Sequence, residues 1–342
     1  MRAAPLAASM GDPGGVGPEL VVRTFAARTA LGLPRFFATG DSGAFARAAT
    51  RAGLSIRIRT VATAAEAAEA AAAGNELVVV EVPLAQAETL GASDPAAAQA
   101  IIGAIDAGVA AVVAGTAAAL VTLPIEKAGL YAAGFAFPGH TEYVAHLTRD
   151  VALPGARGPV MLLAGPRLKV ALATIHVPLM RVASLLSPEN VAHTARVTAE
   201  ALVRDFGIKA PRIAIAGLNP HAGEGGALGH EDSEIVAPAV ATLRAEGLDV
   251  RGPISADALF HEEARARSDA IVALYHDQGL IPAKALDFWD TVNVTLGLPI
   301  VRTSPDHGVA YDIAGKGVAK IESFVAALRC ARAMADARAA AA

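Results

Sequence analysis

Short apolar runs recur along the chain, and between them lie longer stretches in which apolar residues return with helical spacing. An unbroken apolar run of strand length is typical of a strand that is buried on both faces. Strands that alternate with helices in this way predict a parallel, doubly wound α/β sheet. The expected strands cover residues 6–10, 34–39, 77–82, 118–123, 160–164, 168–175, 212–218, 269–275 and 291–295.

Capping residues mark where several of the expected helices begin. Asp41 precedes one helical stretch, Asp94 is followed by a proline in the first turn of the next, and Ser187 precedes a long helix that ends near Phe206. The turn at residues 165–167 reads Gly-Pro-Arg between two apolar runs, which predicts a hairpin. An antiparallel insert of this kind indicates a second subdomain.

Three of the expected strands end in a histidine. His176 follows the strand 168–175, His221 stands just past the strand 212–218, and His276 follows the strand 269–275. In open α/β sheets ligands bind at the carboxyl edge, where such residues gather. We therefore expect the three imidazoles to meet and hold one divalent metal, with zinc or another borderline transition ion suited to nitrogen ligands. Asp277 would then be the hydrogen-bonding partner of a ligand, or only a turn former.

Several polar residues outside the histidine set are candidates for binding an anionic substrate. A cluster of basic residues and hydroxyls suits a small molecule with phosphate and carboxylate groups. Lys284 and Arg302 can equally be surface charges, whereas an unpaired amide at Asn293 within an apolar strand would be costly. Asp257 is a candidate base or ion partner, and a helix cap is the equally good structural alternative. The substrate-binding candidates are His140, Thr141, Lys284, Asn293 and Arg302.

Composition excludes several classes of protein. The formal net charge of the 342-residue chain is −4, which gives no bulk attraction to nucleic acid or to an anionic membrane. Cys330 is the single cysteine, so an internal disulfide or a cysteine metal cluster is excluded. The most membrane-like region, residues 101–125, contains Asp106 and Pro124 and is better explained as a helix followed by a buried strand. No signal peptide is evident, and we expect a cytoplasmic protein.

A glycine-rich turn follows the first expected strand, at residues 11–19. Such a turn between strand and helix either brings backbone N–H groups close to an anion or is only a tight connection, and the spacing leaves both open. The chain contains no G-x-G-x-x-G fingerprint, no Walker loop and no G-x-S-x-G nucleophile motif. A Rossmann dinucleotide site and a serine hydrolase of that type are therefore not indicated.

Read together, these motifs resemble the family of 4-hydroxythreonine-4-phosphate dehydrogenases, enzymes of vitamin B6 synthesis. The resemblance rests on five segments in order, residues 11–19, 138–142, 219–226, 275–279 and 292–308. It implies an isocitrate/isopropylmalate-dehydrogenase-like fold of two α/β domains with a cleft between them. It also implies that His176, His221 and His276 bind a divalent metal (zinc, magnesium or cobalt), and that a homodimer completes each site.

The resemblance also divides the chain into two parts. Residues 1–138 and 300–342 would form the cofactor-side domain, and residues 139–299 would carry the metal, the substrate and the dimer interface. His307, Gly308 and Asp312 resemble an adenosine-binding loop, so NAD or NADP is the expected cofactor, and the sequence does not choose between them. Glu126 departs from the asparagine often found at this position in the family, which places any substrate role of that loop in doubt.

The implied reaction is NAD(P)-dependent oxidation of 4-(phosphooxy)-L-threonine to 2-amino-3-oxo-4-(phosphooxy)butanoate, which loses carbon dioxide to give 3-amino-2-oxopropyl phosphate. Asp257 or Lys284 is the expected base. The alternatives are a sister dehydrogenase acting on a four-carbon sugar-acid phosphate (threonate or erythronate 4-phosphate) or on a dihydrodiol dicarboxylate. A metal-dependent phosphohydrolase or aldolase, and a non-catalytic metal- or nucleotide-binding protein, are alternatives of other classes.

Overall fold

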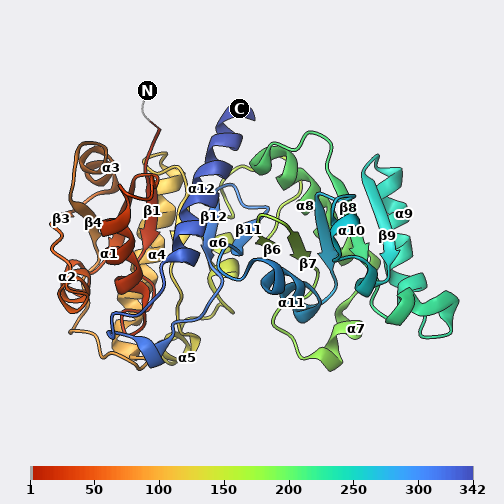
Figure 1. The fold of residues 1–342 in the computed structure, drawn as a ribbon, viewed down its shortest axis with the longest axis horizontal. Helices are drawn as coiled ribbons and strands as arrows, with labels where there is room; N and C mark the ends of the chain where they lie inside the picture. Colours follow the sequence, from red (N-terminus) through yellow and green to blue (C-terminus); the bar gives the residue numbers. More distant parts are fainter. Residues whose placement is uncertain (1–2, 342) are drawn as a thin grey trace. The chain divides into compact units, whose positions relative to one another are not determined.

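The computed structural model describes residues 3–341 and divides the chain into two compact α/β units, each described by itself (Figure 1). Unit 1 holds the residues up to Ala152 together with Pro299–Ala335, and unit 2 holds Leu153–Leu298 with the chain from Asp336. The predicted α/β class is confirmed. The segment 139–152, which the sequence assigned to the second domain, lies in unit 1, where Tyr143 donates a hydrogen bond to Asp106.

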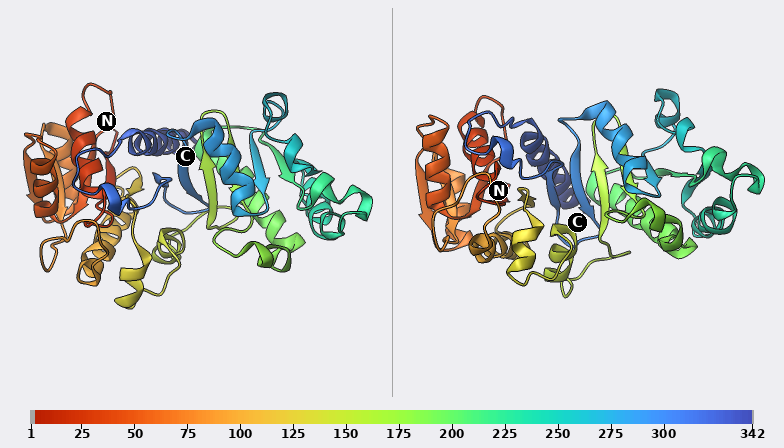
Figure 2. Two further views of the ribbon diagram at one scale, coloured as in Figure 1. Left: turned by 60° about the horizontal axis from the view of Figure 1, so that its bottom comes forward. Right: turned by 90° about the horizontal axis from the view of Figure 1, so that it is seen from below.

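Unit 1 is built on a sheet whose paired strands are all parallel. Its central strands carry no exposed residue, which explains why their sequences show no polar alternation. Helices lie on both faces of the sheet (Figure 2). In order across the sheet the strands are β3 (Ile58–Val61), β4 (Leu77–Glu81), β2 (Phe36–Gly40), β1 (Leu6–Ser9), β5 (Leu120–Thr122) and β12 (Arg302–Pro305).

The helices of unit 1 begin where the caps predict. The Asp41 carboxylate accepts the N–H of Ala44 at the start of α2, and the Asp94 carboxylate accepts the N–H of Ala96 ahead of α4. The helices are α1 (Gly17–Ala27), α2 (Ser42–Arg51), α3 (Ala64–Ala73), α4 (Ala98–Val113), α5 (Lys127–Ala132), α6 (His140–Leu147) and α12 (Glu322–Ala341), which runs on into unit 2, with single 3₁₀ turns η1 (Pro95–Ala97) and η6 (Tyr311–Ile313).

Helix α4 is the membrane-like segment of the sequence. Pro95–Val113 is long and apolar enough to cross a membrane by length and composition alone. Half of that window is buried inside the protein, however, and α4 packs on β1, β2 and β5. It is a core helix followed by a buried strand, as the sequence indicated.

Unit 2 combines parallel and antiparallel strands. The predicted hairpin is confirmed, since β6 (Val160–Ala164) runs antiparallel to β7 and to β11 (Val292–Leu296). The other four strands are parallel, in the order β7 (Lys169–Leu172), β10 (Ala270–Ala273), β8 (Arg212–Ala216) and β9 (Asp249–Ile254).

The sheet of unit 2 is covered by helices on both faces (Figure 2). Its core contains Leu163, Val170 and Ile271 of the strands and Ala283 of α11. The helical elements are η2 (Leu179–Arg181), α7 (Val182–Leu185), α8 (Pro188–Phe206), η3 (Pro220–Gly226), η4 (Asp232–Val236), α9 (Ala237–Ala245), η5 (Ala256–Ala258), α10 (Glu262–Arg265) and α11 (His276–Asp287).

The glycine-rich turn after β1 is completely buried and its backbone donors are used by the protein itself. The N–H of Asp12 donates to the Pro124 carbonyl at 2.8 Å, and the N–H of Gly14 donates to the Asp12 carboxylate at 2.9 Å. The N–H of Val16 donates to the Val309 carbonyl at 3.0 Å. These donors are not available to an anion, so the structure favours the tight connection over the anion cradle.

Candidate functional site

The three predicted metal-binding histidines follow three adjacent, parallel strands. β10 pairs with β7 on one side and with β8 on the other, so the carboxyl ends of all three strands lie at one edge of the sheet in unit 2. His176 lies after β7, His276 opens α11 directly after β10, and His221 lies in η3 after β8. The sequence pattern therefore brings the three elements to one edge, as expected.

His176 and His276 lie close together. Their ring centroids are 5.7 Å apart, and both line a cavity of about 260 Å³ together with Tyr275 and Asp277. The Asp277 carboxylate lies 2.7 Å from Nδ1 of His276. A carboxylate at one ring nitrogen fixes the ring and leaves the other nitrogen for a metal. The donor chemistry of this pair fits a borderline ion such as zinc.

His221 lies in an unusual turn. The residues His221–Gly225 all have positive φ, between 43° and 79°, which makes a left-handed turn that includes three non-glycine residues. Each non-glycine residue in this region costs about 1–3 kcal/mol, and such strain clusters at functional sites. Within residues 3–341, no three His, Cys, Asp or Glu side chains form a group that could hold a metal. Among residues 3–341, His176 and His276 are the predicted ligands whose rings lie close together.

Buried Asp232 holds the base of this turn. Its carboxylate accepts the N–H groups of Leu218 and Asn219 at 2.7 and 3.0 Å, and the Asn219 amide donates to Glu231 at 2.7 Å. These bonds fix the chain immediately before His221. The sequence does not indicate a role for Asp232 or Glu231, because no local pattern shows that their carboxylates accept hydrogen bonds from the loop before His221.

Asp257 lies near His221. It belongs to η5 after β9, where the Ser255 hydroxyl donates to its carboxylate. That bond is the main reason why the pKa of Asp257 lies below its usual value, and the charge of His221 lowers the pKa further. Asp257 is therefore an ionised carboxylate at neutral pH.

Asn293 and Lys284 lie in the same unit. Asn293 is the second residue of β11, and its side-chain carbonyl oxygen Oδ1 is buried with no hydrogen-bond partner among the described residues. Lys284 is half-buried on α11, and its ammonium lies 5.8 Å from the ring centroid of Phe288. A buried oxygen without a partner at a predicted substrate contact is available to accept a hydrogen bond from a bound ligand.

Unit 1 carries the other predicted substrate residues. Arg302 begins β12 and is 3% exposed, and its Nε and Nη2 donate to the Thr122 hydroxyl at 3.1 and 2.6 Å. Burial lowers the pKa of Arg302 to about 10, so the guanidinium stays charged at neutral pH, and nearby Glu142 opposes the shift. A buried, charged guanidinium is suited to a phosphate or carboxylate.

His140 and Thr141 open α6 in the same unit. The Nε2 atom of His140 is buried and has no hydrogen-bond partner among residues 3–341. Burial, followed by the positive charges of Arg302 and Lys127, holds the pKa of His140 well below its usual 6.5. A neutral imidazole with an unused buried nitrogen beside a guanidinium is prepared to bind an anion.

The predicted cofactor residues lie on the segment after β12. Nδ1 of His307 lies 2.9 Å from the Gly308 carbonyl, and a Cβ added at Gly308 would meet no atom within 4 Å. Packing therefore does not require glycine at this position. Tyr311, next to Asp312, donates from its hydroxyl to the buried Asp12 at 2.7 Å. The segment is thus tied to the glycine-rich turn.

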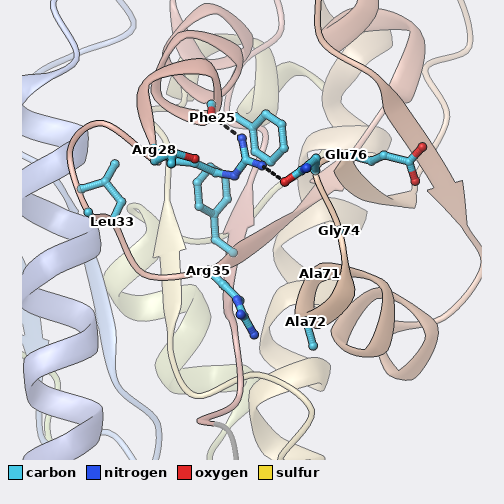
Figure 3. A pocket seen from close by; sticks show the side chains of 12 residues that line it. Phe25, Arg28, Leu33, Arg35, Ala71, Ala72, Gly74 and Glu76 are labelled. Carbon is cyan, nitrogen blue, oxygen red and sulfur yellow. Dashed lines mark hydrogen bonds between the residues drawn. The ribbon is translucent and has the colours of Figure 1, made fainter.

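A second cavity, of about 290 Å³, lies at the amino ends of β2 and β4 (Figure 3). The Arg28 guanidinium lies 3.8 Å from the ring centroid of Phe25 and donates to the Asn75 side chain at 3.4 Å. None of the predicted site residues lines this cavity. It is at the sheet edge opposite to the one from which ligand-binding residues emerge.

Comparison with known proteins identifies close relatives over the whole chain. The model of the family described as pyridoxal phosphate biosynthetic protein PdxA matches residues 33–331. A 4-hydroxythreonine-4-phosphate dehydrogenase from Caulobacter vibrioides is 49% identical over 331 residues, which cover 97% of each chain.

Solved structures give the same picture. A 4-hydroxythreonine-4-phosphate dehydrogenase from Klebsiella pneumoniae is 36% identical, covers 98% of both chains and superposes with a TM-score of 0.85. A terephthalate 1,2-cis-dihydrodiol dehydrogenase from Burkholderia xenovorans is 29% identical over 96% of this chain and 98% of its own, with a TM-score of 0.61.

Proposed function

The chain belongs to the PdxA family of pyridoxal phosphate biosynthetic proteins, and from this premise we propose how its residues oxidise the substrate. It is an oxidoreductase, a 4-hydroxythreonine-4-phosphate dehydrogenase. The observation that carries the proposed mechanism is the pair of imidazoles, His176 and His276, at the shared strand edge. The orphaned polar atoms of His140 and Asn293 support it.

The phosphorylated end of the substrate binds through unit 1 in this proposal. Neutral His140 donates from Nε2 to a phosphate oxygen, Thr141 offers its hydroxyl, and buried Arg302 supplies positive charge. Asn293 and Lys284 are further proposed substrate contacts. Binding at several points holds the carbinol carbon in a fixed position, which accelerates the reaction by orientation.

His176, His221 and His276 would hold one divalent metal, most suitably zinc, with magnesium or cobalt as alternatives. Such an ion, when bound, is a Lewis acid that makes the secondary hydroxyl of the substrate more acidic and polarises the ketone formed from it. The left-handed turn and Asp277 fix the orientation of the second and third imidazoles.

Asp257 is the better supported of the two expected bases. Its carboxylate is ionised and lies near His221, so it is placed to take the hydroxyl proton. The nicotinamide ring of NAD or NADP accepts the hydride from the carbinol carbon. The product is a 3-oxo acid, whose carboxylate leaves as carbon dioxide to give 3-amino-2-oxopropyl phosphate.

The nicotinamide cofactor is proposed to contact His307, Gly308 and Asp312. The open space at Gly308 supports this assignment, because it leaves room for a ligand against the backbone. A cytoplasmic location is part of the same proposal, since soluble nicotinamide cofactors are substrates of the reaction.

The active form is proposed to be a homodimer. Leu179, Met180, Ile281 and Phe288 are 69%, 92%, 67% and 58% exposed, and all four lie in unit 2 on elements that also carry or flank the histidines. Large apolar side chains exposed together mark an interaction surface. A second copy bound there would bring its own ligands to a site that one subunit leaves with two close imidazoles.

The metal site is tested by replacing His221 with alanine. The variant should lose bound metal and should reduce NAD or NADP at least a thousandfold more slowly with the substrate 4-(phosphooxy)-L-threonine (phosphohydroxythreonine). His193→Ala, which removes an exposed histidine from α8, is the matched control and should keep both properties. A His221 variant that is metal-free and fully active would exclude the mechanism.

A sister substrate is tested in the same assay. Turnover with threonate or erythronate 4-phosphate, or with a dihydrodiol dicarboxylate, should be at least a hundredfold less efficient by kcat/KM than with phosphohydroxythreonine. Equal or greater efficiency on one of these compounds would reassign the substrate within the dehydrogenase group.

A further inference from the structure

We propose that Lys127 is a further substrate-binding residue, which contributes its ammonium to the pocket that receives the phosphate. The inference rests on the proposed function and adds a residue to the substrate-binding set expected from the sequence. Lys127 is the first residue of α5, is half-buried, and forms no hydrogen bond or ion pair with the residues that the structure describes.

The chain directs Lys127 toward the start of α6. A Cβ built at Gly139 would lie 3.7 Å from Cε of Lys127 and 3.7 Å from an oxygen of Glu142. Gly139 immediately precedes His140, so the lysine side chain runs alongside the backbone that carries the orphaned imidazole. The Glu126 carboxylate accepts the N–H of Ala128 at 2.9 Å, which fixes the first turn of α5 and with it the origin of the lysine side chain.

The charges of the neighbouring groups agree with this geometry. Arg302 and Lys127 both lower the pKa of His140, so both positive charges act on the same imidazole. Glu142 is the acid that acts on Arg302, and it also borders Gly139. The proposed phosphate-binding pocket would therefore contain two cations, one carboxylate and one neutral imidazole, with a net positive charge.

A phosphate fits this pocket better than a carboxylate does. A phosphate monoester has three acceptor oxygens and a charge of about −1.5 to −2 at pH 7. His140 Nε2, the Thr141 hydroxyl, the Arg302 guanidinium and the Lys127 ammonium supply donors for three oxygens and two positive charges for the dianion. A carboxylate would use half of that charge and leave donors unpaired.

The test uses inorganic phosphate as the probe, as a competitive inhibitor and in direct calorimetric titration. Lys127→Met should raise the Ki and Kd of phosphate about 10- to 100-fold, as expected for the loss of one charged hydrogen bond. The KM for phosphohydroxythreonine should rise by a similar factor while kcat changes less than about threefold, because the reacting hydroxyl is elsewhere on the substrate.

Two further variants complete the experiment. Lys127→Arg keeps the charge and should retain most of the phosphate affinity of the original protein. If the methionine variant is poorly folded, the phosphate Kd of the arginine variant still tests whether a cation at this position binds phosphate. Lys209→Met removes the same charge from an exposed turn between α8 and β8 and should leave Ki, Kd and KM within twofold of their original values. Phosphate affinity that is unchanged in Lys127→Met, or equally reduced in Lys209→Met, would overturn the proposal.

Failure of the proposed function is distinguishable from failure of this inference. If the unaltered protein does not oxidise phosphohydroxythreonine but binds phosphate in a Lys127-dependent way, the substrate assignment fails and the role of Lys127 stands. If it oxidises the substrate with the same KM in the presence and absence of Lys127, the role of Lys127 fails and the substrate assignment stands.

Discussion

At the scale of single residues, two of the predicted substrate-binding residues each keep a buried side-chain atom that has no hydrogen-bond partner among residues 3–341. The two atoms are Nε2 of His140 and Oδ1 of Asn293. A buried polar atom left unpaired costs about 1–3 kcal/mol, so folds rarely keep one without a reason. Binding of a complementary ligand returns this energy, which couples stability to substrate.

Replacing Asn293 with valine should separate the effect of its unpaired oxygen on stability from its effect on substrate binding. The apoprotein should be as stable as the original or more stable by up to about 1 kcal/mol, because valine removes an unsatisfied amide from a strand. The KM for phosphohydroxythreonine should rise at least tenfold. Urea unfolding of the apoprotein and steady-state kinetics measure the two quantities, and a large loss of stability with normal kinetics would contradict the assignment.

His140 makes stability depend on pH in a direction set by its lowered pKa. The unfolded chain protonates His140 at about pH 6.5 while the folded chain does not, so stability is complete above pH 6.5 and decreases below it. Between pH 6.5 and the folded-state pKa the slope from this residue is about 1.4 kcal/mol per pH unit. The difference between the original protein and His140→Gln, measured by urea unfolding from pH 5 to 8, should show this slope and should be flat above pH 7.

At the scale of elements, the sequence predicted best where one physical signal dominated. Apolar runs located β1, β2, β4 and β10, and caps located the starts of α2 and α8. β12 is not among the strands expected from the sequence, because Arg302–Pro305 is polar, yet all four residues are buried. Pairing with β5, and a hydrogen bond from the Thr303 hydroxyl to the Ala327 carbonyl at 3.0 Å, outweigh that polarity. Such long-range partners cannot be read from local pattern.

Helix α6 was not predicted as a helix either, although it carries His140 and Thr141. It is short, it mixes polar with apolar residues without a clear helical period, and it packs on α4. The Tyr143 hydroxyl donates to the Asp106 carboxylate at 2.6 Å, and burial together with that bond raises the pKa of Tyr143. The tyrosine therefore remains a donor at all physiological pH values.

Tyr143→Phe tests that attachment. Loss of a hydrogen bond to a carboxylate should reduce the free energy of unfolding by about 1.5–3 kcal/mol. The KM for the phosphorylated substrate should rise because α6 carries two of its ligands, while metal content stays unchanged. Asp106→Asn retains an acceptor and should have a smaller effect on both quantities, and equal effects of the two variants would indicate that the negative charge of Asp106 provides the whole stabilisation.

At the scale of the whole molecule, the candidate ligands are divided between the two units. Unit 1 carries the residues proposed to bind phosphate, and unit 2 carries the three candidate metal ligands, Asp257 and Asn293. The strands that precede the three histidines are adjacent and parallel, so their carboxyl ends share one sheet edge, whereas binding of one metal by all three imidazoles stays a prediction. The sequence could not predict that His221 would lie in a left-handed turn outside a three-ligand group, because that depends on buried Asp232.

The proposed homodimer can be tested at the exposed apolar surface of unit 2. Met180→Glu places a charge at the most exposed of these positions and should give monomers in light scattering, with loss of bound metal and of activity. Val113→Glu adds the same charge to an exposed residue of unit 1 and should leave the oligomer intact. A fully active monomer of the Met180 variant would show that one copy is sufficient.

The buried glycine-rich turn near the amino terminus packs against backbone that lies far along the chain, at Val309. A Cβ at Gly14 would lie 2.5 Å from the Ala92 carbonyl oxygen, and one at Gly15 would lie 2.6 Å from that of Val309. A single added methyl group at either position would therefore push apart backbones that are remote in sequence. Substitution of Gly15 would displace the Val309 backbone beside residues 307–312, which are proposed to contact the nicotinamide cofactor, so a search for cofactor-binding defects confined to those residues would overlook it.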